Sequence, residues 1–298
     1  MTANDIRNIA LLGHGGSGKT SLAEQMLFMT KGTDRLGRTA DGNTTCDYDA
    51  EEIKRQISIS LAFAPVNYKG VKINVMDAPG NFDFSGEALS AIRAAECAVL
   101  VGAAKDGLSV GMERSWKMLG KKPRMIFINR TDEDNSDYNA TFEALRARFG
   151  NKIAPLVVPI WDEGKKVTGI IDVLNKRAYE MQNGKRVEIE LPEGKEDVVT
   201  QFNDALKESV AETSEEFMDK FFSGEDFTYV EMIQGLRQGV RELSLFPVLC
   251  GSAVNCMGSL MLLDDIVDLL PNPMEGNYHK ATRQDGETEP FVVSPGGV

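Results

Sequence analysis

The chain has 298 residues, of which 42% are hydrophobic and 26% charged, and its formal net charge is −12. That length suits one large domain or two ordinary ones, and the composition excludes disordered, collagen-like and disulfide-rich chains. The surplus of carboxylates argues against electrostatic binding to free DNA, because phosphate neutralisation needs lysine and arginine. Since no run of about 18 apolar residues occurs and the N-terminus is polar and acidic, we expect no membrane span, no signal peptide and a cytoplasmic location.

Cysteine and histidine are sparse. The four cysteines are Cys46, Cys97, Cys250 and Cys256, and the two histidines are His14 and His279. No zinc-binding spacing can be drawn from this set, so free thiols in a reducing compartment are expected.

Along the chain, short apolar runs alternate with amphipathic segments. Strands are expected at residues 6–12, 71–76, 97–101, 125–128 and 247–250. Helices are expected at residues 21–29, 86–95, 112–119, 140–149 and 260–270, where apolar residues recur at three- and four-residue spacing. This alternation predicts a doubly wound α/β fold.

Two stretches depart from the alternation. Residues 57–63 and 71–75 both alternate with period two and are joined across Lys69-Gly70, which predicts an antiparallel hairpin at the edge of a mixed sheet. From about residue 155 to 245 the pattern changes to short strands at 167–174 and 186–190, an acidic turn at 193–197 and helices such as 198–210. Because the last strand and helix of the α/β pattern follow this stretch, it is interpreted as an insertion. Phe221, Phe222 and Phe227 within it are expected to pack in the core or in smaller apolar clusters beside it.

The first motif that carries chemistry runs from Gly13 to Thr20, GHGGSGKT, between a predicted strand and a predicted helix. Its glycines let backbone N–H groups turn toward an anion, Lys19 reaches the β- and γ-phosphates, and the Thr20 hydroxyl can ligate Mg²⁺. The residues assigned to phosphate binding are His14, Gly15, Gly16, Ser17, Gly18, Lys19, Thr20 and Ser21. For His14, a role that merely shapes the turn is favoured over a catalytic one.

The second motif, Asp77-Ala-Pro-Gly80, ends a predicted strand. A carboxylate at that strand end can hold Mg²⁺ through water, and the Gly80 N–H can approach a γ-phosphate because no side chain blocks it. After a phosphate loop, this motif is interpreted as a sensor of the third phosphate.

The third motif, Asn129-Arg-Thr-Asp132, follows a strand at the edge where parallel sheets bind ligands. Asp132 can accept hydrogen bonds from guanine N1–H and N2–H₂ together, a donor pair that adenine lacks. A solvated acidic loop is the alternative, since more carboxylates follow. In Gly251-Ser-Ala253, the backbone N–H groups of Ser252 and Ala253 are expected to donate to guanine O6, which would favour guanine over adenine.

Together these motifs resemble the G domain of elongation factor G and its paralogues, which include elongation-factor-G-like and tetracycline ribosomal protection proteins. Sequence similar to that of the family also occurs at residues 55–58, 80–84, 248–253 and 269–273, so the resemblance covers essentially the whole chain. It implies an α/β P-loop NTPase (Ras-like GTPase) fold with a mixed sheet, bound GTP or GDP, and Mg²⁺ held by Thr20, Ser58 and Asp77.

The resemblance also implies a domain layout and partners. Residues 1–155 and 245–272 would form the GTPase domain, residues 156–244 a small α+β insertion called G′, and residues 273–298 the linker and start of a β-barrel. Further C-terminal domains and the ribosome are the implied partners. The acidic turn at 193–197 is expected to be a solvated face, with docking of a ribosomal stalk protein as the alternative.

Among the positions that depart from the family pattern, three have an expected part in the site. Ser58 replaces the switch I threonine, Arg130 replaces the lysine that covers the base, and Asn81 replaces the catalytic histidine. The expected catalytic residues are therefore Asn81, Lys19 and Gly80, with slow hydrolysis because an amide is a short and neutral substitute. The predicted function is GTP hydrolysis coupled to a ribosomal step. The alternatives are a GTP-dependent ribosome-binding switch with little hydrolysis, or a tetracycline-ribosomal-protection-like factor.

Overall fold

The computed structural model describes residues 2–161, 167–182, 185–276, 280–282, 286 and 288–290. Its main sheet has the strand order β2-β3-β1-β4-β5-β11-β6. These strands span β1 (Ile6–Gly13), β2 (Ala62–Tyr68), β3 (Val71–Asp77), β4 (Cys97–Ala103), β5 (Arg124–Asn129), β6 (Ile153–Pro155) and β11 (Phe246–Cys250). All neighbours run parallel except β2, which pairs antiparallel with β3.

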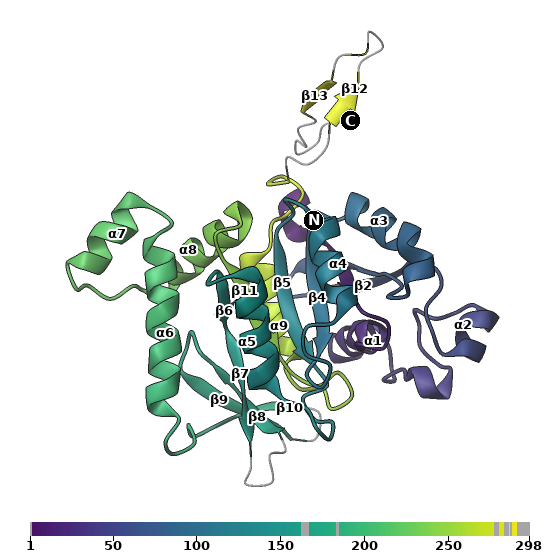
Figure 1. The fold of residues 1–298 in the computed structure, drawn as a ribbon, viewed down its shortest axis with the longest axis horizontal. Helices are drawn as coiled ribbons and strands as arrows, with labels where there is room; N and C mark the ends of the chain where they lie inside the picture. The colour runs from purple at the N-terminus through teal and green to yellow at the C-terminus, as the bar shows by residue number, and fades with distance from the viewer. Residues whose placement is uncertain are drawn as a thin grey trace.

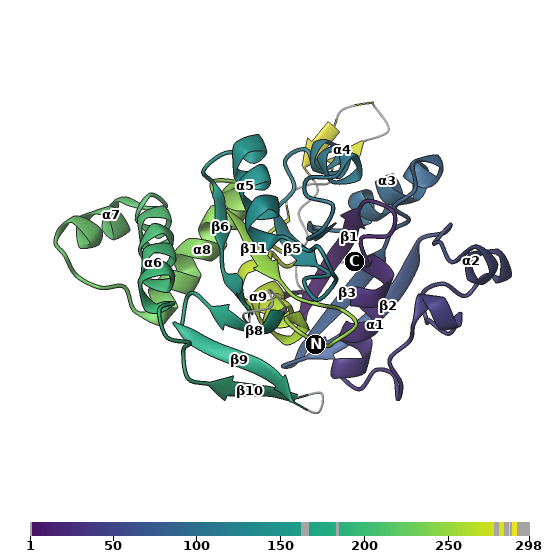
Figure 2. The same ribbon diagram turned by 60° about the horizontal axis from the view of Figure 1, so that its bottom comes forward.

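Helices cover both faces of this sheet. They are α1 (Lys19–Met29), α3 (Ser85–Ala94), α4 (Val110–Leu119), α5 (Tyr138–Phe149) and α9 (Ser259–Leu269), with the short α2 (Ala50–Arg55) at the edge. Figures 1 and 2 show α1 and α9 on one face and α3, α4 and α5 on the other. The predicted α/β fold with a mixed sheet is confirmed, and the expected helices lie within two residues of the observed bounds.

The first strand of the edge hairpin was placed too early by the sequence pattern. The structure puts it at 62–68 rather than 57–63, although the turn does fall at Lys69-Gly70. In β2 the buried face carries the small residues Ala62 and Ala64, while the larger Phe63 is 61% exposed. Pro65 is tolerated because an edge strand needs no N–H on its outer side.

A second, four-stranded sheet has the order β10-β9-β8-β7. Its strands are β7 (Val157–Trp161), β8 (Val167–Asp172), β9 (Arg177–Gln182) and β10 (Lys185–Ile189), followed by the helices α6 (Glu196–Ala211), α7 (Glu215–Phe222) and α8 (Tyr229–Glu242). Two further short strands, β12 (Lys280–Thr282) and β13 (Thr288–Pro290), pair with each other. Most of the chain that was expected to open a following domain, including His279, lies outside the described residues.

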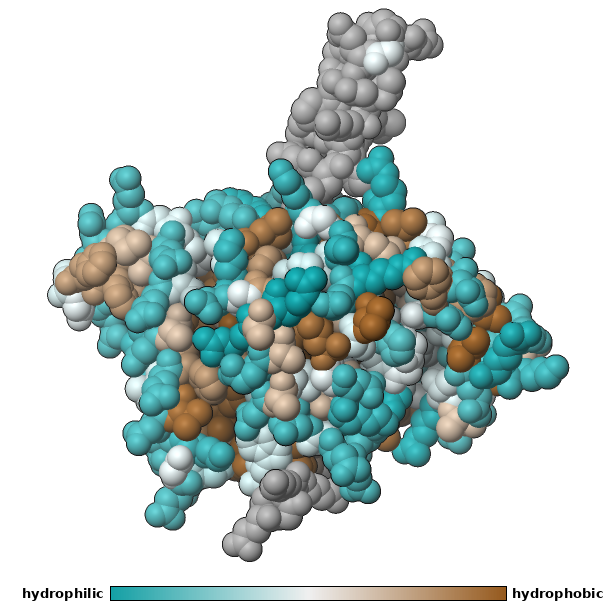
Figure 3. All heavy atoms as spheres, in the orientation of Figure 1, coloured by the Kyte–Doolittle hydropathy of each residue, from teal (hydrophilic) through white to brown (hydrophobic). Residues whose placement is uncertain are grey.

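The predicted phenylalanine cluster is only partly internal. Phe222 is 78% exposed on α7 and does not lie in the core, although its ring centroid is 6.0 Å from that of Phe221. Phe227 packs against the core and forms an edge-to-face pair with buried Phe217, with centroids 5.6 Å apart. Figure 3 shows apolar residues at the tip of the molecule where α7 lies. The four cysteines are free, as expected, and all four are buried.

One tryptophan lies on a helix that covers the main sheet, and the other ends a strand of the four-stranded sheet. Trp116 on α4 stacks on Phe149 with centroids 3.9 Å apart, and the guanidinium of buried Arg124 lies 4.5 Å from its ring. Trp161, at the end of β7, lies 6.2 Å from Tyr138 and 5.4 Å below the Lys195 ammonium.

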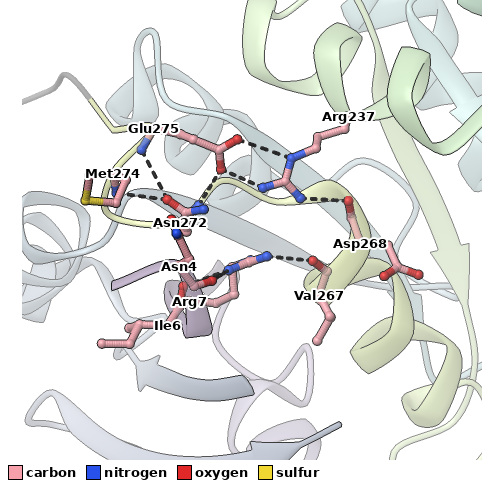
Figure 4. A network of polar contacts seen from close by, with 9 residues as sticks. All are labelled: Asn4, Ile6, Arg7, Arg237, Val267, Asp268, Asn272, Met274 and Glu275. Carbon is pink, nitrogen blue, oxygen red and sulfur yellow. Dashed lines mark hydrogen bonds and ion pairs between the residues drawn. The ribbon is translucent and has the colours of Figure 1, made fainter. Parts of the chain in front are cut away.

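A network of polar contacts joins α8 and β1 to the end of α9 and the segment after it (Figure 4). Arg237 on α8 donates to both carboxylate oxygens of Glu275, at 2.6 and 3.3 Å, and to the Asp268 carbonyl at 2.9 Å. Arg7 on β1 donates to the Val267 carbonyl at 2.8 Å. The end of α9 is thus held from two sides.

None of the described helices is long and apolar enough to cross a membrane.

Candidate nucleotide-binding site

The loop between β1 and α1 is closely packed against β5 and the end of β3. Gly18 has φ +89°, and a Cβ there would overlap the Asn129 amide. A Cβ on Gly80 would lie 2.6 Å from the Gly15 nitrogen. These close approaches need glycine, because any side chain would displace the loop. The loop therefore has the shape of an anion cradle before any ligand contact is considered.

Lys19 is buried within that loop. Its Nζ donates to the Gly13 carbonyl at 3.3 Å and to the His14 carbonyl at 2.9 Å. Burial lowers the pKa of Lys19 to about 8, opposed by the nearby carboxylates of Asp77 and Asp47. The ammonium is held beneath the position that a phosphate chain would take in such a loop.

Hydroxyls and carboxylates form a chain across the start of α1. Thr20 Oγ1 donates to Asp77 Oδ2 at 2.6 Å and lies 3.1 Å from Ser58 Oγ, and Ser58 Oγ donates to Asp47 Oδ1 at 2.7 Å. The predicted metal residues Thr20, Ser58 and Asp77 are thus brought together. Asp47, which sequence reasoning missed, completes the cluster; a carboxylate ahead of the Arg55–Ser58 motif was its only signal.

Asp77 and Asp47 each have one carboxylate oxygen that accepts no hydrogen bond. Asp77 Oδ1 and Asp47 Oδ2 are buried without a hydrogen-bond partner, as is Ser17 Oγ. Burial raises the pKa of Asp77 to about 7 and also raises that of Asp47. An uncompensated buried carboxylate is costly, so this donor set fits a hard cation such as Mg²⁺. Among the described residues, no group of three or more acidic, histidine or cysteine side chains is placed to hold a metal ion.

Buried glutamates hold the segment that carries Asp47 and Ser58. Glu52 accepts from the Ile59 and Ser60 amides at 2.9 and 3.0 Å, directly after Ser58. Glu24 on α1 accepts from the Cys46 amide at 3.1 Å, directly before Asp47. Buried side chains therefore position both Asp47 and Ser58.

The predicted base-binding residues occupy two loops. Asn129 Nδ2 donates to the Ser17 carbonyl at 2.9 Å, and its Oδ1 accepts from the Ala253 amide at 3.0 Å. The Ser252 amide donates to the Met257 carbonyl at 3.1 Å. Asn129 thus ties both loops to the phosphate loop, and the two backbone donors expected for guanine O6 have protein partners.

Asp132 is half-buried and has a partner that sequence reasoning missed. Asn255 Nδ2 donates to its Oδ2 at 3.0 Å, and the Asn255 backbone amide is fixed by Ser252 Oγ at 3.3 Å. Arg130 adopts φ +60° and bonds Glu133 at 2.6 Å. One oxygen of Asp132 is oriented and the other is available.

One cavity of about 790 Å³ gathers much of the site. Its lining includes His14, Gly15, Gly16, Gly18, Lys19, Thr20, Ser21, Ser58, Gly80, Asn81, Arg130 and Ala253. Ser17, Asp77, Asn129, Asp132 and Ser252 do not line it. Asn81 is exposed, and its side chain makes no hydrogen bond to any residue that the structure describes. The fold and this site define a P-loop nucleotide-binding domain of the GTPase type.

Comparisons with known proteins agree. The model of the elongation factor Tu GTP-binding domain matches residues 4–272. The elongation factor G-like protein of Mycobacterium tuberculosis, in strains CDC 1551 / Oshkosh and ATCC 25618 / H37Rv, is 34% identical over 274 residues, which cover 91% of this chain and 38% of that protein. A crystal structure of a protein from Thermus thermophilus aligns with a TM-score of 0.87 at 36% identity, covering 91% of this chain and 41% of that one.

The chain therefore belongs to the elongation factor Tu GTP-binding domain family, whose members are GTPases that bind guanine nucleotides. It resembles the G domain of elongation-factor-G-like proteins, as expected. It spans about two fifths of the length of these relatives.

Proposed function

We propose that this chain binds GTP and GDP with Mg²⁺ and hydrolyses GTP in a ribosome-coupled step of translation. The observation that carries the proposal is the chain Asp77–Thr20–Ser58–Asp47 beside a glycine-rich phosphate loop, with two buried carboxylate oxygens unpaired. Such a set fits a nucleotide-bound magnesium ion and has no evident structural use.

Each residue has a definite part in the proposed reaction. Lys19 binds the β- and γ-phosphates, and the Gly80 N–H contacts the γ-phosphate. Thr20, Ser58 and Asp77 would hold Mg²⁺, with Asp47 behind Ser58. Bound Mg²⁺ would supply neutralisation of developing phosphate charge, and Asn81 orients the attacking water.

The base is read at the other end of the site. Asp132 accepts from the guanine edge through the oxygen that Asn255 leaves available, while Arg130 covers the base. Asn129 holds the loops together rather than contacting guanine. The ribosome and further domains of a longer chain are the proposed partners.

The test is a titration calorimetry series together with GTP turnover measured with and without ribosomes. GDP should bind far more tightly than ADP, because a mismatched base leaves Asp132 unpaired. Lys19→Ala should weaken both nucleotides by on the order of 100-fold, since it removes charge-assisted hydrogen bonds worth about 3 kcal/mol. Equal GDP and ADP affinities would contradict the guanine assignment.

A second candidate is a switch that binds the ribosome with GTP and hydrolyses little. Asn81 favours it, because the exposed, neutral side chain has no partner among the described residues that would hold it against a water. Asn81→His should then raise ribosome-stimulated turnover by about tenfold or more, as positioned acid–base groups commonly do. Rapid turnover of the unmodified protein with no gain from the substitution would instead favour an ordinary GTPase.

A further inference from the structure

The first turn of α4 lies directly against the phosphate loop. A Cβ on Gly111 would lie 2.6 Å from the His14 Cα and 2.8 Å from its Nδ1, so this helix position tolerates only glycine. Residues three apart on a helix share a face. Arg114, one turn beyond Gly111, therefore faces the same side of the site, and it lines the cavity together with Gly80 and Asn81.

Arg114 contacts an aromatic ring there. Its guanidinium carbon lies 3.6 Å from the ring centroid of Phe82. Within the described part of the chain Arg114 has no carboxylate partner, whereas its neighbour Glu113 pairs with Arg148 of α5. The Arg114 guanidinium therefore interacts with the Phe82 ring instead. This contact is favourable because the face of an aromatic ring carries negative charge density.

Phe82 directly follows Asn81 and begins a short 3-10 helix (Phe82–Phe84). It is 70% exposed, so packing in the core does not hold it. The Phe84 amide donates at 3.2 Å to the carbonyl of Asn81, the residue just before this helix, so a hydrogen bond closes the turn around Phe82. A contact that fixes the Phe82 ring therefore fixes the position of Asn81.

We propose that Arg114 is a positioning residue that ties residues 81–84 to α4 by stacking on Phe82, and so sets where Asn81 stands relative to a γ-phosphate. This rests on the proposed GTP hydrolysis. Because α4 packs on the phosphate loop through Gly111, the contact between Arg114 and Phe82 connects that loop to the segment that carries Asn81. The role is distinct from binding the nucleotide, because neither Arg114 nor Phe82 belongs to the phosphate, magnesium or base residues.

The test is a double-mutant cycle with Arg114→Ala, Phe82→Ala and both together, in the full chain bound to GDP or to a non-hydrolysable GTP analogue. Hydrogen exchange of the 81–84 amides should rise several-fold in each single variant and no further in the double variant, because both remove the same contact. Arg114→Lys, which keeps the charge, should restore part of the protection. Lys117→Ala, an exposed cation on the same helix, is the matched control and should change nothing.

Turnover gives the functional arm. Both single variants should lower kcat by on the order of fivefold at unchanged GDP affinity and thermal midpoint, with the double variant no slower. Unchanged exchange, additive effects, or a loss of GDP affinity and stability together would overturn the tether. Raised exchange with unchanged kcat would overturn its part in positioning Asn81. Absence of GTP turnover in the unmodified protein would count against the proposed hydrolysis instead, while the exchange measurement still decides the tether.

Discussion

Asp132 and Asn255 show how a base-reading carboxylate is prepared at the level of single residues. The carboxylate lies on a loop after β5, and the amide that orients it comes from the loop after β11. Because Asn255 occupies one carboxylate oxygen, Asp132 presents the other in a fixed direction. Preorganisation of this kind lowers the cost of binding without adding a contact to the ligand.

Asn255→Ala should therefore weaken GDP binding by about three- to tenfold, since a hydrogen bond to a charged group contributes about 1 kcal/mol or more. ADP binding should not change, because adenine offers Asp132 no donor pair. Titration calorimetry with both nucleotides checks this. Asp132→Ala serves as the reference that removes the preference entirely. A parallel loss for ADP would mean that the loop had collapsed.

Residues in contiguous motifs could be predicted, and residues brought together by loops could not. Lys19, Thr20 and Asp77 follow from local patterns because strand ends in a parallel sheet converge on one edge. Asp47 and Asn255 act through partners 11 and 123 residues away in the sequence, Ser58 and Asp132. No period or spacing marks such pairs. The hydrogen bonds that the Ser252 and Ala253 amides make within the protein could not be predicted for the same reason.

At the scale of elements, the stretch between α1 and β2 contains only short helices and is held mainly by buried acids. Glu52 caps α2 by accepting from the Asp49 amide at 3.1 Å, and it also accepts from the amides of Ile59 and Ser60. These amides cannot then join a strand. The alternating apolar pattern at 57–63 therefore placed the start of β2 too early. Strands were predicted correctly where their amides were free to pair with a neighbouring strand.

Glu52→Ala should leave three amides without partners and loosen Ser58. We expect faster hydrogen exchange at Ile59 and Ser60 and a weaker Mg²⁺ dependence of GTP binding, because each unsatisfied buried group costs about 1–3 kcal/mol. Glu51→Ala is the matched control, since the Glu51 side chain is 43% exposed and its one ion pair among the residues that the structure describes is with Arg55. If both variants behaved alike, the role of Glu52 would be refuted.

The start of α8 predicts a pH dependence. Glu231 accepts from the Thr228 amide at 2.7 Å and pairs with Lys220 at 2.7 Å. These hydrogen bonds lower the pKa of Glu231 to about 2 from an ordinary 4.5. A lowered folded-state pKa stabilises the protein above pH 4.5, and this contribution is lost as the pH falls toward 2.

Glu231→Gln should accordingly lower the thermal midpoint at pH 7, and the difference from the unmodified protein should shrink as the pH falls below about 4.5. Thermal unfolding followed by circular dichroism at several pH values measures it. Glu208→Gln, an exposed position on α6, should show no such trend. A difference that stayed constant with pH would exclude the charge as its cause.

At the scale of the whole molecule, the proposed insertion packs on the GTPase part without contributing to the nucleotide site. Arg186 of β10 reaches Asp264 on α9 at 3.1 Å, and Arg237 of α8 reaches Glu275. All residues assigned to phosphate, metal and base lie outside residues 156–244. The two sheets meet near Leu156, whose amide donates to the Val248 carbonyl at 2.8 Å.

Removing residues 157–244 and bridging Leu156 to Leu245 should leave GDP affinity within about twofold, because distant sites that share no partner are nearly independent. The shortened chain should be less stable, since it loses the contacts to α9. Calorimetry of the folded product tests this. A folded product that no longer binds GDP would contradict the proposed boundaries.

The chain has only two tryptophans, and their placement gives it a built-in optical readout. Trp116 lies on α4, two residues beyond Arg114, and is stacked on Phe149, whereas Trp161 lies at the end of β7. Indole emission depends on the groups around the ring. A Trp161→Phe variant would leave one emitter on the helix that contacts the phosphate loop, so movement of that helix on nucleotide exchange would be visible without an attached dye.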